Sequence, residues 1–469
     1  MFFDEMRAVD GSPRESYRNI DTWLANTNAE QLEIKRKQTE ILFRRIGITF
    51  AVYGEGGDPE RLIPFDIIPR IITAAEWALL EKGLAQRVNA LNRYVADIYG
   101  PQEILKAGII PEDEVLLNEG YMPEVQGVLP ANGIYSHISG VDLVRVDENE
   151  FYVLEDNLRT PSGVSYVLEN REVMMRLFPE LFASHRIAPV ENYPDYLLST
   201  LIESAPVNCP GDPQVAVMTP GRFNSAYFEH SFLADKMGVP LVEGLDLFIE
   251  ENVVYMRTTT GPQRLDVIYR RLDDAFMDPL ELRADSTLGV PGILNAYRAG
   301  NVTLANAVGA GIGDDKAIYT YVPEMINFYM GEKPILNNVP TWRCNQADDL
   351  KYVLDHLEEV VVKEVHGSGG YGMLVGPSST KAEREKFAAL LKEAPAKYIA
   401  QPTVSLSTCP TFVNEGVAPR HVDFRPFVLS GKQIRIFKGG LTRVALNEGS
   451  LVVNSSQGGG TKDTWVLEG

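Results

Sequence analysis

The chain has 469 residues, of which 45% are hydrophobic and 23% charged, so it is long enough to fold as two or three packed units. Its formal net charge of −20 would repel nucleic acid phosphates and anionic lipid head groups, so neither a nucleic acid nor a membrane surface is an expected partner. No stretch approaches the roughly 20 apolar residues of a membrane span, and residues 1–10 lack the apolar run of a secretory signal.

The three cysteines, Cys209, Cys344 and Cys409, are scattered and do not have the spacing of metal ligands. This pattern predicts a reduced, cytoplasmic chain and argues against structural zinc. Each cysteine could act as a nucleophile, but none has a histidine nearby in sequence to activate it. Buried, unreactive cysteine is therefore the favoured interpretation.

The first third of the chain is predicted to be mainly helical. From Trp77 to Ile98, apolar residues recur at steps of three and four, which places one apolar stripe along a long helix that Gly100 and Pro101 end. Residues 28–46 form another candidate helix, whose many charges indicate a largely solvated face.

Short alternating runs follow from about Val141 and indicate an α/β unit with strands and helices in turn. Its elements are expected at residues 214–218 (strand), 224–237 (helix), and 239–242 and 252–256 (strands). After Gly300, helices are expected at residues 317–329 and 380–393, with short strands between them.

Two alternating strands, residues 141–147 and 151–155, flank the turn residues Glu148 and Asn149 and predict a tight hairpin. If the turn has two or four residues, Asp142 lies directly opposite Glu155, and Asn157 projects from the same face. A three-residue turn would place Asp142 on the other face.

Like charges opposite each other on a sheet destabilise it unless they share a proton or a cation. Magnesium prefers hard oxygen ligands, so Asp142, Glu155 and Asn157 are candidate magnesium ligands. The alternative is a solvated hairpin face that carries ordinary surface acids.

A glycine-rich loop, residues 366–372, follows a strand at 360–365 and precedes a returning strand at 373–375. Loops of the Rossmann and Walker types connect a strand to a helix, whereas this one joins two strands and predicts a flap over bound phosphates. Lys363 would supply the positive charge. Flap candidates for nucleotide binding are Gly367, Ser368, Gly369 and Gly370. A plain hairpin loop is the alternative.

Later strands carry four further candidates. Gln401 lies on a short strand whose backbone could bind an adenine edge, although an ordinary core strand would look the same. Arg425 and Arg443 could clamp a transferring phosphoryl group, or they could be surface charges. Asn454 opens a polar, glycine-rich run that could approach a ligand closely.

Together these motifs resemble the ATP-grasp superfamily, and more closely the circularly permuted ATP-grasp proteins related to glutathionylspermidine synthase. The resemblance extends from Val9 to Leu467. In ordinary ATP-grasp enzymes the flap lysine precedes the metal-binding strand, whereas here Glu155 and Asn157 precede Lys363, which is what a circular permutation implies. The motifs that carry it are residues 153–157 with 159–163, 315–316, 362–363 with the flap, 423–427, 440–445 and 454–460.

The resemblance implies an α/β (mixed α+β) fold with a circularly permuted ATP-grasp core. The expected ranges are a mostly helical N-terminal region (1–130), the metal-binding hairpin with an inserted small α/β domain that resembles the domain preceding the fold in unpermuted relatives (131–300), and an ATP-binding part with the flap and C-terminal strands (301–469). It also implies magnesium at Asp142, Glu155 and Asn157, ATP at Lys316 and Lys363, and the reacting phosphate at Arg425, Arg443 and Asn454.

The implied function is an ATP- and magnesium-dependent carboxylate–amine ligase that acts through an acyl phosphate. Its partners would be small-molecule or peptide carboxylates and amines, with a protein partner as a further candidate. The alternatives are a nucleotide-binding scaffold without catalysis and an ATP-dependent kinase.

The sequence differs from glutathionylspermidine synthases in two respects. Their pattern has an arginine two residues before the first metal aspartate, where this chain has Gly140. We therefore expect Arg145 or Arg159 to stabilise the acyl phosphate. The bifunctional relatives also carry a cysteine amidase domain, for which this sequence has no counterpart.

Overall fold

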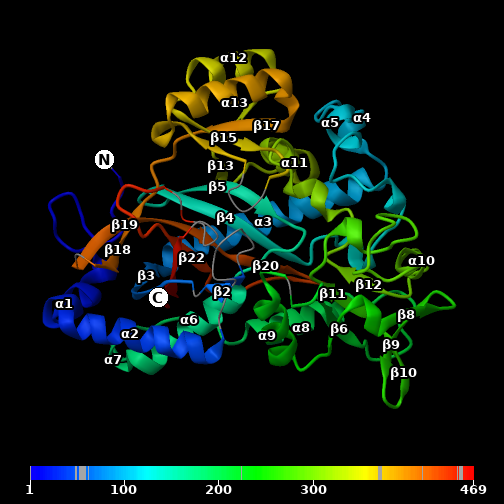
Figure 1. Ribbon diagram of the computed structural model, residues 1–469, viewed down its shortest axis with the longest axis horizontal. Helices are drawn as coiled ribbons and strands as arrows, with labels where there is room; N and C mark the ends of the chain where they lie inside the picture. The colour runs from blue at the N-terminus through cyan, green and yellow to red at the C-terminus, as the bar shows by residue number, and fades with distance from the viewer. Residues whose placement is uncertain are drawn as a thin grey trace.

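The computed structural model describes residues 2–47, 50–51, 60–61, 63–222, 224–367, 372–414, 416–451, 453 and 458–469. Within these residues the fold is a mixed α/β arrangement of five sheets, with helices packed around them (Figure 1). The predicted fold class is thus confirmed.

A ten-stranded sheet forms the centre of the molecule. Its main path runs β13 (Asn337–Asn338), β5 (Glu150–Asn157), β4 (Ile138–Asp147), β19 (Gly416–Arg425), β22 (Leu441–Val444), β23 (Gly460–Val466) and β3 (Phe65–Ile72). Off this path lie β18 (Thr408–Val413), β20 (Phe427–Ser430) and β21 (Ile434–Ile436). Each of the three expected ranges (1–130, 131–300 and 301–469) contributes strands to this sheet. The parallel pairing of β3 with β23 was not predicted.

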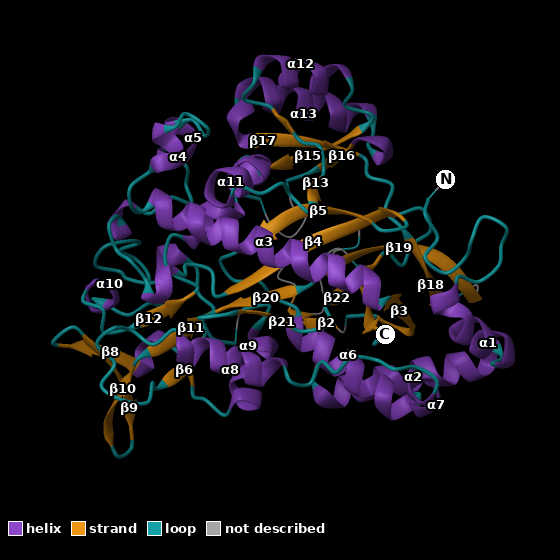
Figure 2. Ribbon diagram, turned by 180° about the vertical axis from the view of Figure 1, so that it is seen from behind, coloured by secondary structure: helices purple, strands orange, loops and turns teal. Residues whose placement is uncertain are grey.

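Both long N-terminal helices form where they were predicted. Asn28 caps α2 (Ala29–Ile46) and Thr73 caps α3 (Ala74–Ile98), each in a capping box with the residue three positions on. The apolar stripe of α3, which includes Trp77 and Leu84, packs on Val141, Leu143 and Val153 of the β4–β5 hairpin. Figure 2 shows α3 crossing the central sheet on this side. One face of the hairpin is therefore closed by a helix.

The predicted small α/β unit is present as a four-stranded parallel sheet. Its order is β12 (Thr303–Ala305), β11 (Val267–Arg270), β6 (Val215–Met218) and β7 (Leu241–Val242), and α9 (Tyr227–Met237) connects β6 to β7. The strand expected at 252–256 does form, but in a separate antiparallel sheet of β8 (Leu247–Glu250), β9 (Val253–Thr258) and β10 (Gly261–Leu265). The parallel strands direct their carboxyl ends toward one edge, which is where ligands bind in open α/β sheets.

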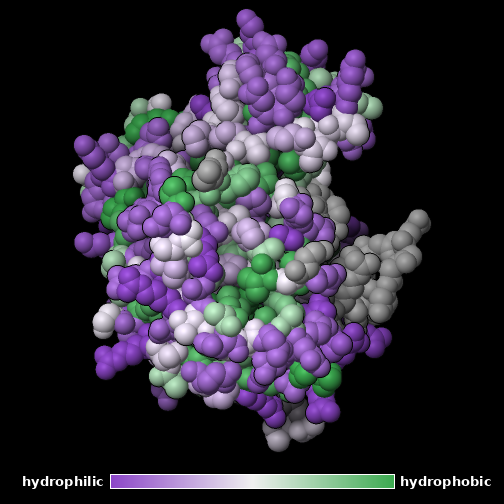
Figure 3. Space-filling view, turned by 90° about the vertical axis from the view of Figure 1, so that its left-hand side faces the viewer, coloured by the Kyte–Doolittle hydropathy of each residue, from purple (hydrophilic) through white to green (hydrophobic). Residues whose placement is uncertain are grey.

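A smaller lobe stands above the central sheet at the top of Figure 1. It combines a sheet of β14 (Trp342–Arg343), β17 (Tyr398–Pro402), β15 (Val360–Glu364) and β16 (Leu374–Val375) with α12 (Ala347–Asp355) and α13 (Lys381–Glu393). β15 and β16 pair antiparallel, which confirms the strand–loop–strand order of the flap. Figure 3 shows mainly hydrophilic side chains over this lobe, so its helices face solvent.

The remaining helices and one strand pair complete the described fold. The other helices are α1 (Arg18–Asn26), α4 (Glu103–Lys106), α5 (Glu112–Leu116), α6 (Val164–Leu177), α7 (Pro179–Ala183), α8 (Tyr193–Glu203), α10 (Ile293–Arg298) and α11 (Val322–Met330), and a further strand pair is β1 (Phe50–Ala51) with β2 (Glu60–Arg61). Among the described residues, no helix has both the length and the apolar character that a bilayer span requires.

Candidate functional site

A cavity of about 730 Å³ lies between the upper lobe and the central sheet. Apart from Arg145, every predicted site residue that the structure describes lies in its wall: Asp142, Glu155, Asn157, Arg159, Lys316, Lys363, Gly367, Gln401, Arg425 and Arg443. Ser368, Gly369, Gly370 and Asn454 fall outside the described residues. Side chains up to about three hundred positions apart in sequence are thus brought into one cavity.

The β4–β5 hairpin has the register that the sequence predicted. Its turn consists of Glu148 and Asn149, and Asn149 has a φ of 67°, which asparagine tolerates better than most residues. Asp142 lies directly opposite Glu155 and Gly140 opposite Asn157, although two irregularities shift the pairing between Asp142 and the turn. The predicted convergence of two carboxylates and an amide is therefore present.

The Asp142 carboxylate is buried and bound by two arginines. Arg425 donates to it from Nε and from Nη2, the latter over 2.8 Å, and Arg443 Nη2 donates over 2.7 Å. Burial alone would raise the pKa of Asp142, but the guanidinium groups of Arg425 and Arg443 hold that pKa well below its ordinary value. In this structure Asp142 holds the arginines, while its role as a metal ligand stays a prediction.

Arg443 also contacts a second buried carboxylate. Asp423 lies opposite Arg443 in the β19–β22 pairing, and Arg443 Nε donates to its oxygens over 2.9 and 3.0 Å. Burial raises the pKa of Asp423 although Arg443 opposes this. Two arginines and two aspartates thus form one compact buried cluster at the cavity wall.

Glu155 and Asn157 keep oxygen atoms available for a cation. Glu155 is half-buried, and its nearest cations are Lys316 Nζ at 3.7 Å and Arg425 Nη2 at 3.9 Å. The Asn157 amide nitrogen donates to Gly140 O over 3.3 Å, which leaves the amide oxygen as an acceptor. These hard oxygen donors suit magnesium when substrate phosphates complete its coordination. In the described part of the chain, no group of three or more His, Cys, Asp or Glu side chains has metal-binding geometry.

Lys363 points to Gln401 rather than to a carboxylate. Its Nζ donates to Gln401 Oε1 over 2.8 Å, and Gln401 Nε2 donates to Thr341 Oγ1 over 3.1 Å. Burial lowers the pKa of Lys363, and Glu155 only partly offsets this. In this structure the Gln401 amide is therefore occupied at both ends, by Lys363 at its oxygen and by Thr341 at its nitrogen. Recognition of adenine by Gln401 stays a prediction.

The other nucleotide candidate, Lys316, joins the central sheet to the base of the flap. Its Nζ donates to Gly367 O over 2.6 Å and lies 3.7 Å from Glu155. Next to it, the buried Asp315 lies 3.2 Å from His366 Nδ1. The first residues of the flap, His366 and Gly367, are thereby attached to the rim of the cavity.

Arg159 lies at the far end of the cavity, near the carboxyl edge of the parallel sheet. It donates from Nε to Asp314 over 2.7 Å and from Nη1 to Asp273 over 3.3 Å. Burial opposes its charge, but Asp314 and Asp273 raise the pKa of Arg159 overall. Its side chain is 37% exposed, so a charged guanidinium faces the cavity space.

The absence of a side chain at Gly140 has a structural reason. A Cβ there would lie 3.0 Å from Pro161 Cβ and 3.2 Å from Arg425 Cδ. Arg425 therefore fills the space beside Gly140 and supplies the guanidinium nearest to it. The expectation for Arg145 is wrong, because Arg145 points to the opposite face of β4.

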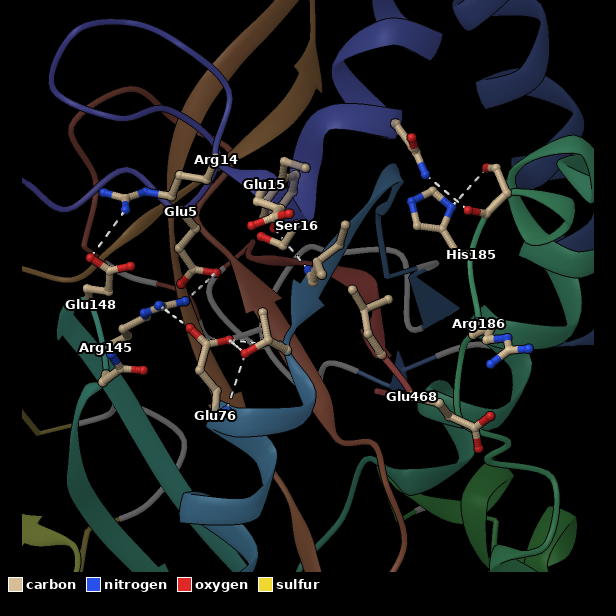
Figure 4. Close-up of a pocket in the computed structure, with 17 residues that line it drawn as sticks. Glu5, Arg14, Glu15, Ser16, Glu76, Arg145, Glu148, His185, Arg186 and Glu468 are labelled. Atoms are coloured by element: carbon tan, nitrogen blue, oxygen red, sulfur yellow. Dashed lines mark hydrogen bonds and ion pairs between the residues drawn. The ribbon is translucent and has the colours of Figure 1, made fainter.

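Arg145 lines a second cavity of about 520 Å³, which Figure 4 shows. There Arg145 pairs with Glu76 and lies 3.8 Å from Glu5, while Arg14 lies 3.7 Å from Glu148. The buried Arg145 is thus paired with buried carboxylates. Apart from Arg145, this cavity contains none of the predicted site residues.

Sequence reasoning missed part of the main cavity. Ser162 and Gly163 were noted only within a motif, and the acids and aromatic residues Asp273, Asp274, Phe276 and Tyr166 were not considered. The acids follow β11, so the predicted α/β unit could have indicated them through the rule that parallel strands direct their carboxyl ends to a ligand site.

Comparisons with known proteins agree with this geometry. A family model described as circularly permuted ATP-grasp type 2 matches residues 69–445. An uncharacterized protein of Synechocystis sp. is 53% identical over 469 residues, which cover 100% of this chain and 97% of that protein. A Mycobacterium tuberculosis protein is also 53% identical, over 468 residues that cover 100% of this chain and 84% of that protein.

Two further similar proteins have more specific names. A putative glutamate–cysteine ligase of Frankia casuarinae is 40% identical over 469 residues, which cover 99% of this chain but 53% of that protein. Among solved structures, a glutathione synthetase-like effector from Globodera pallida in its apo form has a TM-score of 0.60 at 11% identity, covering 94% of this chain and 98% of that chain. This last likeness shows the fold alone.

Proposed function

The chain belongs to the circularly permuted ATP-grasp type 2 family, and on this premise we propose that it is an ATP-dependent carbon–nitrogen ligase that joins a carboxylate to an amine through an acyl phosphate. The observation that carries the proposal is the single cavity that contains Lys316, Lys363, Arg425, Arg443 and the Glu155–Asn157 pair. Cations for phosphate oxygens and oxygen ligands for a metal occur there together.

Each charged group has a separate task in this proposal. Lys363 and Lys316 bind the phosphates of ATP, and Arg425 and Arg443 hold the terminal phosphate in line for transfer. Magnesium, held by Glu155 and Asn157, would neutralise phosphate charge. The carboxylate oxygen attacks the terminal phosphorus and ADP leaves. The amine nitrogen then attacks the acyl carbon, and phosphate and a proton are released.

The two ends of the cavity suit two different ligands. Below the upper lobe, the wall is apolar and suits the adenine ring; it consists of Leu154, Val361, Val375, Val404, Leu406 and Val453. At the other end, Arg159 offers a guanidinium to a carboxylate or an acyl phosphate, and Asp273 offers a carboxylate to an amine. We therefore place the nucleotide at the first end and the substrates at the second.

The names of relatives give a first list of substrates. The chain spans about half of the Frankia protein, so the glutamate–cysteine ligase activity in that name belongs to a longer chain. A peptide carboxylate with a polyamine, as in glutathionylspermidine synthesis, is the second pair to test.

We propose the cytoplasm as the compartment, because all three cysteines are free thiols.

Isotope transfer tests the reaction type. With ATP, magnesium and an ¹⁸O-labelled carboxylate, we expect turnover to require an amine and to move one ¹⁸O atom into the released phosphate. A kinase would transfer phosphate to a hydroxyl without any amine. If ATP binds but no pair of carboxylate and amine releases ADP, the scaffold alternative replaces the ligase.

A further inference from the structure

A buried ion pair lies directly behind the cavity wall. Glu229 on α9 and Arg271 at the end of β11 are 2% and 4% exposed, and Arg271 Nη2 lies 3.3 Å from Glu229 Oε1. Both residues belong to the small α/β unit, and neither is among the side chains that line the cavity. Burying two charges costs hydration energy, so such a pair is expected only where its contacts offset that cost.

The pair binds one short segment, residues 160–163, which does line the cavity. Arg271 donates from Nη1 to Pro161 O over 2.8 Å and from Nη2 to Ser162 Oγ. Glu229 Oε2 accepts from Gly163 N over 2.7 Å and, at the start of α6, from Ser165 N and Oγ. Consecutive residues of the segment are thus fixed by charge-assisted hydrogen bonds, which are the stronger kind.

The same segment contacts Arg425 from its other side. Ser162 O accepts from Arg425 Nη1 over 3.3 Å, and both Pro161 and the Arg425 stem lie beside Gly140, where a Cβ would come within 3.0 and 3.2 Å of them. Gly163 has a φ of 115°, and a Cβ there would lie 2.6 Å from Leu441 Cδ2, so the segment has little room to shift. The position of Arg425 is therefore defined by Asp142 on one side and by this segment on the other.

We propose that Glu229 and Arg271 are positioning residues for Arg425, so that the small α/β unit sets the geometry of the terminal-phosphate clamp. The inference rests on the proposed function, in which Arg425 holds the terminal phosphate of ATP. It assigns the inserted unit a task in the reaction besides packing. ADP lacks the phosphate that Arg425 would hold, so the preference for ATP over ADP reports the position of this guanidinium.

Calorimetric titration of the full chain with ATP and with ADP, each with magnesium, tests the inference. We expect Glu229→Gln to reduce the preference for ATP over ADP about 10-fold, with ADP affinity changed less than about 2-fold. Ser162→Ala removes the bond from Arg271 and a long bond to Thr160 O but little packing, and it is expected to act in the same direction if Glu229→Gln does not fold. In an Arg425→Met background, Glu229→Gln should cause no further loss, because the two residues act as one unit.

Asp463→Asn is the matched control. It breaks another buried ion pair that contacts α6, since Arg171 of α6 donates to Asp463 of β23 over 2.9 Å, and neither residue lines the cavity. We expect it to lower stability and to leave the preference for ATP unchanged. Folded Glu229→Gln and Ser162→Ala variants with the wild-type preference would overturn the inference while the ligase proposal stands. A wild type that binds neither nucleotide would overturn both.

Discussion

Replacing Lys363 by methionine is expected to weaken ATP binding between about 10- and 100-fold, because a charge-assisted bond to a phosphate oxygen is lost. Methionine keeps most of the length of the side chain, so packing around Gln401 changes little. Calorimetric titration with ATP and magnesium measures the loss. Lys392→Met, at an exposed position on α13 of the same lobe, is the control and should bind like wild type.

When no nucleotide is present, wild type should gain thermal stability relative to the same variant as pH rises through the lowered pKa of Lys363. The pKa of Lys363 is lowered by burial, so the folded protein holds this proton less firmly than the unfolded chain does. At pH values below that lowered pKa, the charged lysine therefore reduces the free energy of unfolding. This cost declines as pH rises through the lowered pKa. Wild-type ATP affinity in Lys363→Met would contradict the assignment of Lys363 to the phosphates.

Replacing Asp142 by asparagine is expected to lower the free energy of unfolding by about 3–5 kcal/mol, because Arg425 and Arg443 lose the carboxylate that they share. Chemical denaturation measures the change. Glu155→Gln is the control within the same hairpin: its ion pairs are long and half-exposed, so it should alter stability by less than about 1 kcal/mol.

The pH dependence of this difference follows from the lowered pKa of Asp142. The stabilisation is complete above the ordinary pKa of 3.8 and is lost as pH falls through the lower pKa of the folded protein. Wild type and Asp142→Asn should therefore converge in stability at strongly acidic pH. A variant within about 1 kcal/mol of wild type at neutral pH would show that the arginines do not depend on Asp142.

The hairpin and the flap were predictable because local rules determine them. Alternation and a two-residue turn fix the register that places Asp142 opposite Glu155, and a glycine-rich loop between two apolar strands indicates a flap. Alternation could also have excluded Arg145, because residues three apart on a strand point to opposite faces. That error came from reasoning about proximity in sequence alone.

The charge pairing inside the site could not be predicted. Arg425 is 283 positions from Asp142, and Glu229 is 42 from Arg271 and 66 from Gly163, so no sequence spacing connects them. These contacts depend on how the small α/β unit and the C-terminal strands pack on the hairpin. For the same reason the sequence offered Asp142 as a metal ligand without indicating that two arginines bind it.

The central claim is that this cavity binds ATP together with magnesium, and calorimetric titration of the wild-type chain with ATP, with magnesium and with a chelator, tests it most directly. We predict tight binding that requires magnesium, and loss of that requirement in a variant that combines Glu155→Gln with Asn157→Ala. Wild-type protein that shows no magnesium-dependent ATP binding would contradict the account.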